Sequence, residues 1–406
     1  MKEKIKQLAE KYLPEVIQIR RHLHANPELS FEEYNTSKFI ASKLKEFGIP
    51  YKEKIAKTGI VATIIGTQSS SLNGKKENRL CIALRADMDA LPITEANEVE
   101  YKSKTPGVMH ACGHDAHIAS LLGAAKILNE IKNTSSSLLG AEFRGTIKLI
   151  FQPGEEKSPG GASLMIKEGV LDNPAPLSIF AQHVFPSLEV GKVGFCNGKY
   201  LASADEIYLT VKGKGGHAAI VKSYINPLLI ASEILLKLHQ TFMKQETIPT
   251  VLAFGKIIGN GATNVIPDEV KIEGTFRTMD EKWRKEAHSI IRQICISTAH
   301  SMDGECEINI MSGYPALVND ENITTNAKNY AEEFLGKENV VTLEPRMASE
   351  DFSFFAQKIP ACFYRLGTGN KSKGIISGVH TPTFNIDESA LQTGMGLMAW
   401  IAMKEL

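Results

Sequence analysis

One nine-residue stretch, Met109 to His117, constrains this chain more than any other. It reads Met-His-Ala-Cys-Gly-His-Asp-Ala-His, and it holds three histidines, one cysteine and one aspartate. Cys112 and His114 are two residues apart, so in an extended or turning backbone both side chains can face one ion. A thiolate and an imidazole together suit zinc or a related first-row divalent ion. The alternative interpretation is a helix N-terminus that is rich in polar caps, because an apolar helical run follows directly.

Length and charge limit the classes of protein that fit. The chain has 406 residues, which favours two domains, and its 46 basic and 46 acidic residues give a formal net charge of +0. Without a basic excess, neither nucleic acid nor a membrane is expected as a partner. The six cysteines are scattered without CxxC pairs, and the N-terminus lacks the apolar segment of a signal peptide. We therefore expect a cytoplasmic protein with reduced thiols.

Hydrophobic runs with polar ends indicate an α/β domain. Strands are expected at residues 60–65, 80–84, 146–151 and 178–183, and a helix at 118–131. Three of these strands lead into polar groups at Asp87, at Glu155 with Glu156, and at His183. Open α/β sheets place their sites at the carboxyl ends of strands. We expect a mixed sheet flanked by helices, with the site at that edge.

The pattern changes near Ala202. From there to residue 310 the expected order is β-α-β-β-α-β, which is typical of a ferredoxin-like α+β domain. The α/β pattern returns at about Gly313. The sequence therefore predicts one domain made of residues 1–201 and 313–406, and a second domain, residues 202–312, inserted into it.

The N-terminal region predicts further helices. Helical periodicity extends from about Lys2 to His24, and Pro14 is expected to start a second helical segment at its first turn. Ser30 and Glu33 have the spacing of a capping box. The helix that they would open is expected to stop at Gly48.

Five side chains at strand ends and loops of the α/β domain are candidate metal ligands: Cys112, His114, Glu156, His183 and His380. Two divalent ions need ligands from several segments, and a bridging thiolate or carboxylate can hold such a pair about 3.5–4 Å apart. Glu155 and Glu156 are adjacent on a strand end and point opposite ways. One can therefore bind metal while the other moves a proton, although two acidic residues at a helix N-terminus are an alternative.

Two further residues have candidate roles beside the metal ligands. Asp87 can hydrogen-bond a ligand histidine from outside the metal shell. His217 follows a glycine-rich segment that lets the backbone approach another surface closely. From there it either donates to an oxyanion or lies in a turn.

The motifs together resemble the metal-dependent amidohydrolases that include hippurate hydrolases, aminoacylases, indole-acetyl-amino-acid hydrolases and N-acetyl-diaminopimelate deacetylases. The resemblance covers nearly the whole chain. It rests on the stretch described above and on the segments Arg20–His24, Arg85–Pro92, Gln152–Glu156, Gly215–Ala219, Thr263–Pro267, Gly274–Thr278, Ser349–Phe352 and Val379–Pro382. Two departures, Val221-Lys222 for the usual Pro-His and Asn226-Pro227 for the usual Asp-Pro, lie in the lid and affect the expected acyl preference.

The resemblance implies a role for each candidate. The metal ligands would be Cys112, His114, Glu156, His183 and His380, with Cys112 bridging two divalent ions, which in this family are zinc, manganese, cobalt or nickel. Glu155 would be the general base and Asp87 the catalytic aspartate outside the metal shell. Asn264 and Arg277 would meet the substrate carboxylate. The inserted domain would form a lid and a homodimer interface, across which His217 reaches a neighbouring site in some members.

The resemblance also implies a reaction. We expect metal-dependent hydrolysis of the amide bond of an N-acyl amino acid, in which activated water attacks the carbonyl and Glu155 shuttles the proton. A dipeptidase or exopeptidase is the alternative within the same class. A binding protein without catalysis is disfavoured because Glu155 is present. A serine hydrolase and a zincin are disfavoured because neither GxSxG nor HExxH occurs.

Overall fold

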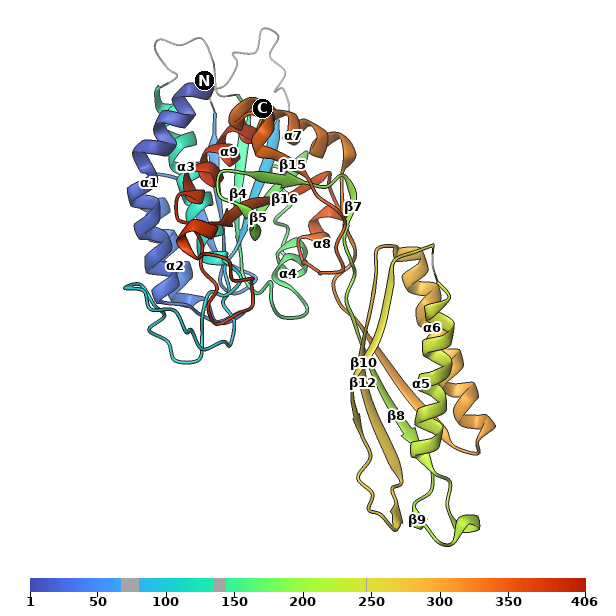
Figure 1. The fold of residues 1–406 in the computed structure, drawn as a ribbon. Coiled ribbons are helices and arrows are strands. Elements are labelled where there is room, and N and C mark those ends of the chain that lie inside the picture. The colour runs from blue at the N-terminus through green and yellow to red at the C-terminus, as the bar shows by residue number, and fades with distance from the viewer. Residues whose placement is uncertain (67–79, 135–143, 246) are drawn as a thin grey trace. The chain divides into compact units, whose positions relative to one another are not determined.

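A computed structural model describes residues 1–66, 80–134, 144–245 and 247–406 (Figure 1). The chain divides into two compact units. Unit 1 comprises residues 1–198, 318–344 and 354–406, and unit 2 comprises residues 199–317 and 345–353. The chain passes between them in β7 (Gly198–Leu201), in β14 (Leu317–Asn319) and on either side of residues 345–353. Each unit has a hydrophobic core of its own.

Unit 1 is built on an eight-stranded mixed sheet, as the sequence predicts. The strands in spatial order are β1 (Tyr51–Ile55), β2 (Gly59–Ile65), β4 (Thr146–Gln152), β3 (Cys81–Asp87), β5 (Ser178–Glu189), β16 (Ala361–Gly369), β6 (Val193–Phe195) and β15 (Val340–Thr342). The central strands β4, β3, β5 and β16 are parallel to one another. Every residue of β3, β4 and β16 is buried, which explains their nearly continuous apolar runs.

Helices flank this sheet (Figure 1). They are α1 (Lys2–Ala25), α2 (Tyr34–Glu46), α3 (His114–Thr134), α4 (Gly161–Lys167), α7 (Glu321–Leu335), α8 (Ser353–Ala356) and α9 (Ala390–Glu405), with short 3-10 turns at Lys337–Asn339 and Lys371–Lys373. Helices α1, α3 and α9 pack against one another, and both α3 and α9 contact β3. The N-terminal and C-terminal helices therefore share one core with the central strands.

Two predictions about the N-terminal region are wrong. Pro14 lies inside one continuous helix, α1, because apolar residues on both sides of it are buried along the same face, among them Leu8 and Val16. Ser30 does not cap α2 but donates to Asp89 Oδ2 at 2.6 Å. The carboxylate of Glu33 is also engaged away from the helix start.

Strand β5 is longer than the sequence suggests. The expected strand ended at His183, whereas β5 continues to Glu189. Its continuation pairs with β16 in parallel, so backbone hydrogen bonds extend the strand beyond its apolar run. His183 consequently lies within a strand rather than at its end.

Unit 2 contains a separate four-stranded antiparallel sheet. The chain order is β8 (Asp205–Lys212), α5 (Pro227–Met243), β10 (Thr250–Ile258), β12 (Glu269–Thr278), α6 (Glu281–Ser301) and β13 (Glu305–Ser312), and the spatial order is β10-β12-β8-β13. Buried and exposed residues alternate along β8, as expected for a sheet with one face on the helices. Two short strands, β9 (Gly216–His217) and β11 (Val265–Ile266), pair with each other, and a 3-10 turn spans Val221–Ser223.

Within the described ranges, the helices contain no segment that is both long and apolar enough to span a bilayer.

Candidate metal centre

The sheet register brings three strand segments of unit 1 to one edge. Asp87, the last residue of β3, lies opposite Gln152, the last residue of β4, and Glu155 follows three residues later. On the other side of β3, Arg85 lies opposite Ala181, which places Asp87 level with His183. Parallel pairing therefore gathers side chains that are about 30 to 100 residues apart in sequence at the carboxyl edge of the sheet.

A glycine turn sets the positions of Cys112 and His114. Gly113 has a φ of 84°, and a Cβ added there would lie 2.5 Å from Val184, so only glycine fits. Helix α3 begins directly at His114. The backbone N–H of His380 donates to the carbonyl of Ala111 at 2.7 Å, which holds the last candidate ligand beside this turn.

The five predicted ligands converge in unit 1. Cys112 Sγ lies 3.4 Å from His183 Nε2 and 3.3 Å from His380 Nε2. Glu156 Oε1 lies 3.1 Å from His380 Nε2 and 3.9 Å from His114 Nε2. Two groups of ligand atoms, each within 4.8 Å, share Cys112: one with His114 and His183, the other with Glu156 and His380.

The ring nitrogens are oriented as metal ligands require. His114 Nδ1 lies 3.2 Å from Asp89 Oδ1 and donates to it, so Nε2 is the nitrogen that faces the cluster. His183 Nδ1 donates to the Val184 carbonyl at 2.8 Å, and its Nε2 is likewise directed inward. His114 Nε2 is buried without a hydrogen-bond partner among the described residues. A buried, unpartnered nitrogen beside a thiol and a carboxylate fits a bound divalent cation.

The pKa shifts of the cluster also fit a bound cation. Burial raises the pKa of Cys112 well above its usual range, and the charges of Glu156 and Glu155 add to this effect. Burial lowers the pKa of His114, but Asp87 and Asp89 outweigh it and raise the value to about 10. The site therefore concentrates negative charge, which a cation would neutralise when it displaces protons from the ligands.

Asp87 is held from two sides. Arg85 Nη1 donates to its Oδ2 at 2.6 Å, and His117 Nδ1 donates to its Oδ1 at 2.5 Å. The tautomer of His117 follows from its other nitrogen, because Nε2 accepts from the backbone N–H of Val184 at 2.9 Å. Burial opposes ionisation of Asp87, but His114 and Arg85 hold its pKa well below the usual range. Asp87 is therefore a fixed anion, with Oδ2 3.8 Å from His114 Nε2.

The loop with the two glutamates is fixed by acceptors from distant segments. The N–H of Gly154 donates to Glu33 Oε1 at 2.8 Å, and the N–H of Glu156 donates to Asp89 Oδ2 at 2.9 Å. Glu155 is buried, and its ligand oxygen lies within 4.8 Å of those of His114 and Glu156. Glu155 and Glu156 thus both point at the same cluster, and the prediction that they point opposite ways from a strand end is wrong, because β4 ends at Gln152 and both residues lie in the loop that follows.

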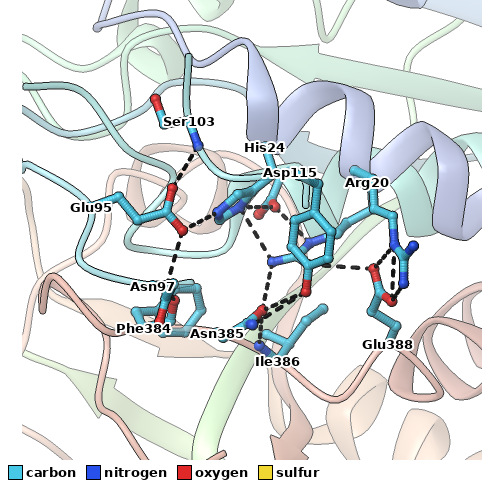
Figure 2. A network of polar contacts seen from close by, with 12 residues as sticks. Arg20, His24, Glu95, Asn97, Ser103, Asp115, Phe384, Asn385, Ile386 and Glu388 are labelled. Atoms are coloured by element: carbon cyan, nitrogen blue, oxygen red, sulfur yellow. Dashed lines mark hydrogen bonds and ion pairs between the residues drawn. The ribbon is translucent and has the colours of Figure 1, made fainter. Parts of the chain in front are cut away.

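A buried polar network supports the ligand segments from behind. Figure 2 shows Arg20 and His24 of α1 meeting at Asp115, which follows a predicted ligand at the start of α3. Arg20 Nε and His24 Nδ1 each lie 2.8 Å from Asp115 Oδ2, and His24 Nε2 lies 3.1 Å from Glu95. Arg20 Nη2 also donates to Asn385 at 3.1 Å, in the segment after the last predicted ligand. The network thus joins α1 to both ends of the ligand set.

Sequence reasoning missed three supporting residues: Glu33, Asp89 and His117. Asp89 was visible as the second acidic residue of the strand-end segment after β3. His117 lay within the histidine-rich stretch but has the pattern of an ordinary helix residue. Glu33 was assigned to a capping box instead, and nothing in the sequence indicates its partner Gly154, which is 121 residues away.

The three remaining candidates, His217, Asn264 and Arg277, belong to unit 2. His217 on β9 pairs with Val265 on β11, and the Ala218 N–H donates to the Asn264 carbonyl at 3.0 Å, so these segments are adjacent. Arg277 is near the far end of β12, and its Nη1 donates to the Met347 carbonyl at 3.1 Å. Unit 2 therefore keeps Arg277 apart from the other two candidates.

Known proteins resemble this chain over nearly its full length. A model of peptidase family M20/M25/M40 matches residues 83–404. An IAA-amino acid hydrolase (ILR1-like 4) of Arabidopsis thaliana is 39% identical, covering 96% of this chain and 86% of that protein. Thermostable carboxypeptidase 2 of Saccharolobus solfataricus is 37% identical, covering 99% and 98%.

A solved structure agrees with the fold. It is a Bacillus subtilis protein, YXEP, described as a dinuclear metal binding peptidase from the M20 family, with 32% identity, a TM-score of 0.81, and coverage of 97% of this chain and 98% of that one. The predicted resemblance is thereby confirmed. The chain belongs to peptidase family M20/M25/M40, the metal-dependent hydrolases that act on the amide bonds of amino-acid conjugates or peptides.

Proposed function

We propose that this enzyme hydrolyses the amide bond of N-acyl amino acids to a carboxylate and a free amino acid. The observation that carries the proposal is the placement of Glu155 beside a complete set of candidate ligands, with its oxygen within 4.8 Å of those of His114 and Glu156. The 39% sequence identity to an IAA-amino acid hydrolase supports the same class of substrate.

The candidate ligands form two groups that could each hold one ion. One would be held by Cys112, His114 and His183, and the other by Cys112, Glu156 and His380, so that the thiolate is shared. Zinc, manganese, cobalt and nickel all suit sulfur, nitrogen and carboxylate donors. Such a pair, when bound, lowers the pKa of a water molecule and polarises the amide carbonyl.

Glu155 is the proposed general base. Its carboxylate accepts the proton of the attacking water and then returns it to the leaving amide nitrogen, so one group serves both halves of the reaction. Asp87 is proposed to act from outside the ligand shell, because Arg85 and His117 hold it as an anion near His114. This negative charge lies beside His114 Nε2, the nitrogen that would bind the metal, and therefore favours a cation there.

The residues of unit 2 are proposed to bind the substrate and its oxyanion. His217 Nδ1 accepts from the Ala219 N–H at 3.2 Å, so Nε2 carries the proton and can donate to an oxyanion. Asn264 and Arg277 are proposed to meet the substrate carboxylate. From Glu269 to Arg277, β12 extends roughly 26 Å at about 3.3 Å per residue. One small substrate therefore does not span from Arg277 to the segment of His217 and Asn264 within a single unit.

That separation supports a homodimer in which unit 2 acts as lid and interface, with His217 serving the site of the neighbouring subunit. Apolar side chains on α5 and β10 are exposed in unit 2, including Leu229 at 60%, Met243 at 67% and Ile257 at 52%. Strand β10 is at the edge of its sheet, where unpaired backbone groups can accept a second strand. We retain the cytoplasm as the proposed location, because the scattered cysteines lack a disulfide-type pattern.

The base is tested by Glu155→Gln, which keeps the size of the side chain and removes its basicity. We expect turnover to fall by roughly 10²–10⁴-fold, with metal content and folding retained. Free-amine release and elemental analysis give the two readouts, and the exposed Glu10→Gln serves as a matched control. Near-normal turnover in Glu155→Gln would refute the assignment.

The substrate class is tested with a panel of N-acetyl, N-benzoyl, indole-acetyl and long-chain N-acyl amino acids, with dipeptides alongside. Chelator-treated protein is assayed before and after zinc or manganese is restored. Metal-dependent release from one acyl class supports the proposal. Release from dipeptides alone would instead establish the alternative, a dipeptidase or exopeptidase, which the identity to a carboxypeptidase favours.

Exchange of His217 is tested by mixing two inactive variants, Glu155→Gln and His217→Ala. If His217 acts across the interface, each mixed dimer regains one intact site, and about a quarter of all sites become active after random exchange. If it acts within its own chain, the mixture stays inactive. Light scattering on the same samples establishes whether the protein is a dimer.

A further inference from the structure

Two cysteines of unit 2 face each other between a helix and the strand that follows it. Cys295 on α6 is fully buried, and Cys306 on β13 is half-buried and packs on the same hydrophobic cluster. The Cys295 thiol donates to the Cys306 sulfur, and the Cys306 thiol lies 3.7 Å from the Glu307 carbonyl, its own acceptor. Neither residue takes part in the proposed metal centre, which lies in unit 1.

The backbone sets this arrangement. Helix α6 ends at Ser301, and the N–H of Gly304 donates back to the carbonyl of Ala299 at 2.9 Å, so the chain reverses tightly into β13. Cys306 lies directly opposite Val211 on β8, which is fully buried. Opposed residues of antiparallel strands share one face of the sheet, so the side chain of Cys306 points under α6.

The two thiols differ in reactivity. The hydrogen bond from Cys295 lowers the pKa of Cys306 against the opposing effect of burial, whereas the same hydrogen bond and burial raise the pKa of Cys295. The more accessible sulfur, that of Cys306, is therefore the better nucleophile. The buried sulfur of Cys295 lies next to it and can attack it in a second step. This division between an attacking and a resolving thiol is the one that reactive cysteine pairs use.

We propose that Cys295 and Cys306 form a redox-active dithiol that closes to an intramolecular disulfide when it meets a small-molecule disulfide such as oxidised glutathione. The Cys306 thiolate attacks one glutathione sulfur, the glutathione S–S bond breaks, and one glutathione thiolate leaves and takes up a proton. Cys295 then loses its proton and attacks the Cys306 sulfur, releasing the second glutathione. The protein loses two electrons and two protons, and one glutathione disulfide becomes two thiols.

The closed disulfide would connect the last turns of α6 to the start of β13. Strand β13 is the edge strand opposite β10 in the sheet of unit 2. The reaction is therefore independent of the proposed dimer contact at β10. It is likewise independent of catalysis, so its test does not depend on finding the substrate.

The test uses metal-loaded, full-length protein equilibrated with reduced and oxidised glutathione at a series of ratios. Samples are quenched in acid, unfolded, alkylated and digested with trypsin. Both cysteines fall in one tryptic peptide, residues 293–328, because no lysine or arginine lies between them. A second digestion with a glutamate-specific protease cuts after Glu305 and places the two cysteines in separate fragments, which stay joined only through a disulfide.

At oxidising ratios we expect two of the six thiols to escape alkylation and the two fragments to remain linked. Cys306→Ser should abolish this loss, whereas the matched control Cys196→Ala, at a buried cysteine outside the pair, should keep it. Full alkylation of Cys295 and Cys306 in folded protein at the most oxidising ratio would overturn the proposal. A mixed disulfide with glutathione that persists at Cys306 without closing, or a linkage between two chains, would overturn it as well.

Discussion

Glu33 provides a sharp test of how the loop that carries Glu155 and Glu156 is held. Its carboxylate is fully buried and accepts three hydrogen bonds, from the N–H groups of Phe31 at 2.9 Å and Gly154 at 2.8 Å and from the hydroxyl of Thr58 at 2.6 Å. Glu33→Ala leaves both N–H groups without this acceptor. Each orphaned donor costs about 1–3 kcal/mol. Burial raises the pKa of Glu33, which shows that burying its charge is itself unfavourable. Removing the carboxylate relieves that penalty and offsets part of the cost of the orphaned donors. We therefore expect the free energy of unfolding to fall by about 2–4 kcal/mol.

Glu33→Gln separates hydrogen bonding from charge. Both N–H groups bind the same oxygen, Oε1, which the glutamine oxygen can replace. The new amide then faces Thr58, whose hydroxyl can rotate to accept instead of donate. The expected loss is about 1 kcal/mol.

The assay reports on unit 1 alone. The chain has two tryptophans, Trp283 in unit 2 and Trp400 in unit 1. In a Trp283→Phe background, urea unfolding followed by Trp400 emission gives the free energy of unfolding of unit 1. The exposed neighbour Glu32→Ala is the matched control. If Glu33→Ala and the control agree within about 0.5 kcal/mol, Glu33 does not hold the loop and the reasoning fails.

Two further predictions concern the ligand set and the network behind it. The neighbouring carboxylates raise the pKa of His114 to about 10 against burial, so below that pH a metal must displace a proton from the ring. Burial and the glutamates also raise the pKa of the Cys112 thiol, so a metal must displace its proton as well. Metal affinity, measured by competition with a chromogenic chelator, should therefore rise by more than about tenfold per pH unit between about pH 7 and 9, and an affinity independent of pH would contradict this. Arg20→Met removes the buried partner of Asp115 and should destabilise unit 1 by about 3–5 kcal/mol in the Trp400 assay. A loss below about 1 kcal/mol would show that the network does not stabilise the ligand segments.

Local patterns determined much of the architecture. The predicted order β-α-β-β-α-β is the order found in unit 2. The side chains of Asn226 and Asp280 cap the starts of α5 and α6, and such a signal is local because a cap and its helix are neighbours in sequence. The same local reasoning was wrong at Pro14 and at Ser30. There, burial across the core and a hydrogen bond to Asp89 outweighed the local preference.

For the site, the sequence by itself determined which chemical groups are available. The thiol, the imidazoles and the paired carboxylates at strand ends are enough to indicate a metal-dependent hydrolase, since ligand type follows from residue type. Only the tertiary structure decided which of them meet. Cys112 and His380 are 268 residues apart and lie 3.3 Å from each other through sheet register and loop packing. The roles of Glu33 and Asp89 arise in the same way, because an acceptor is assigned by whichever backbone N–H the fold brings to it, and no spacing in sequence encodes that distance.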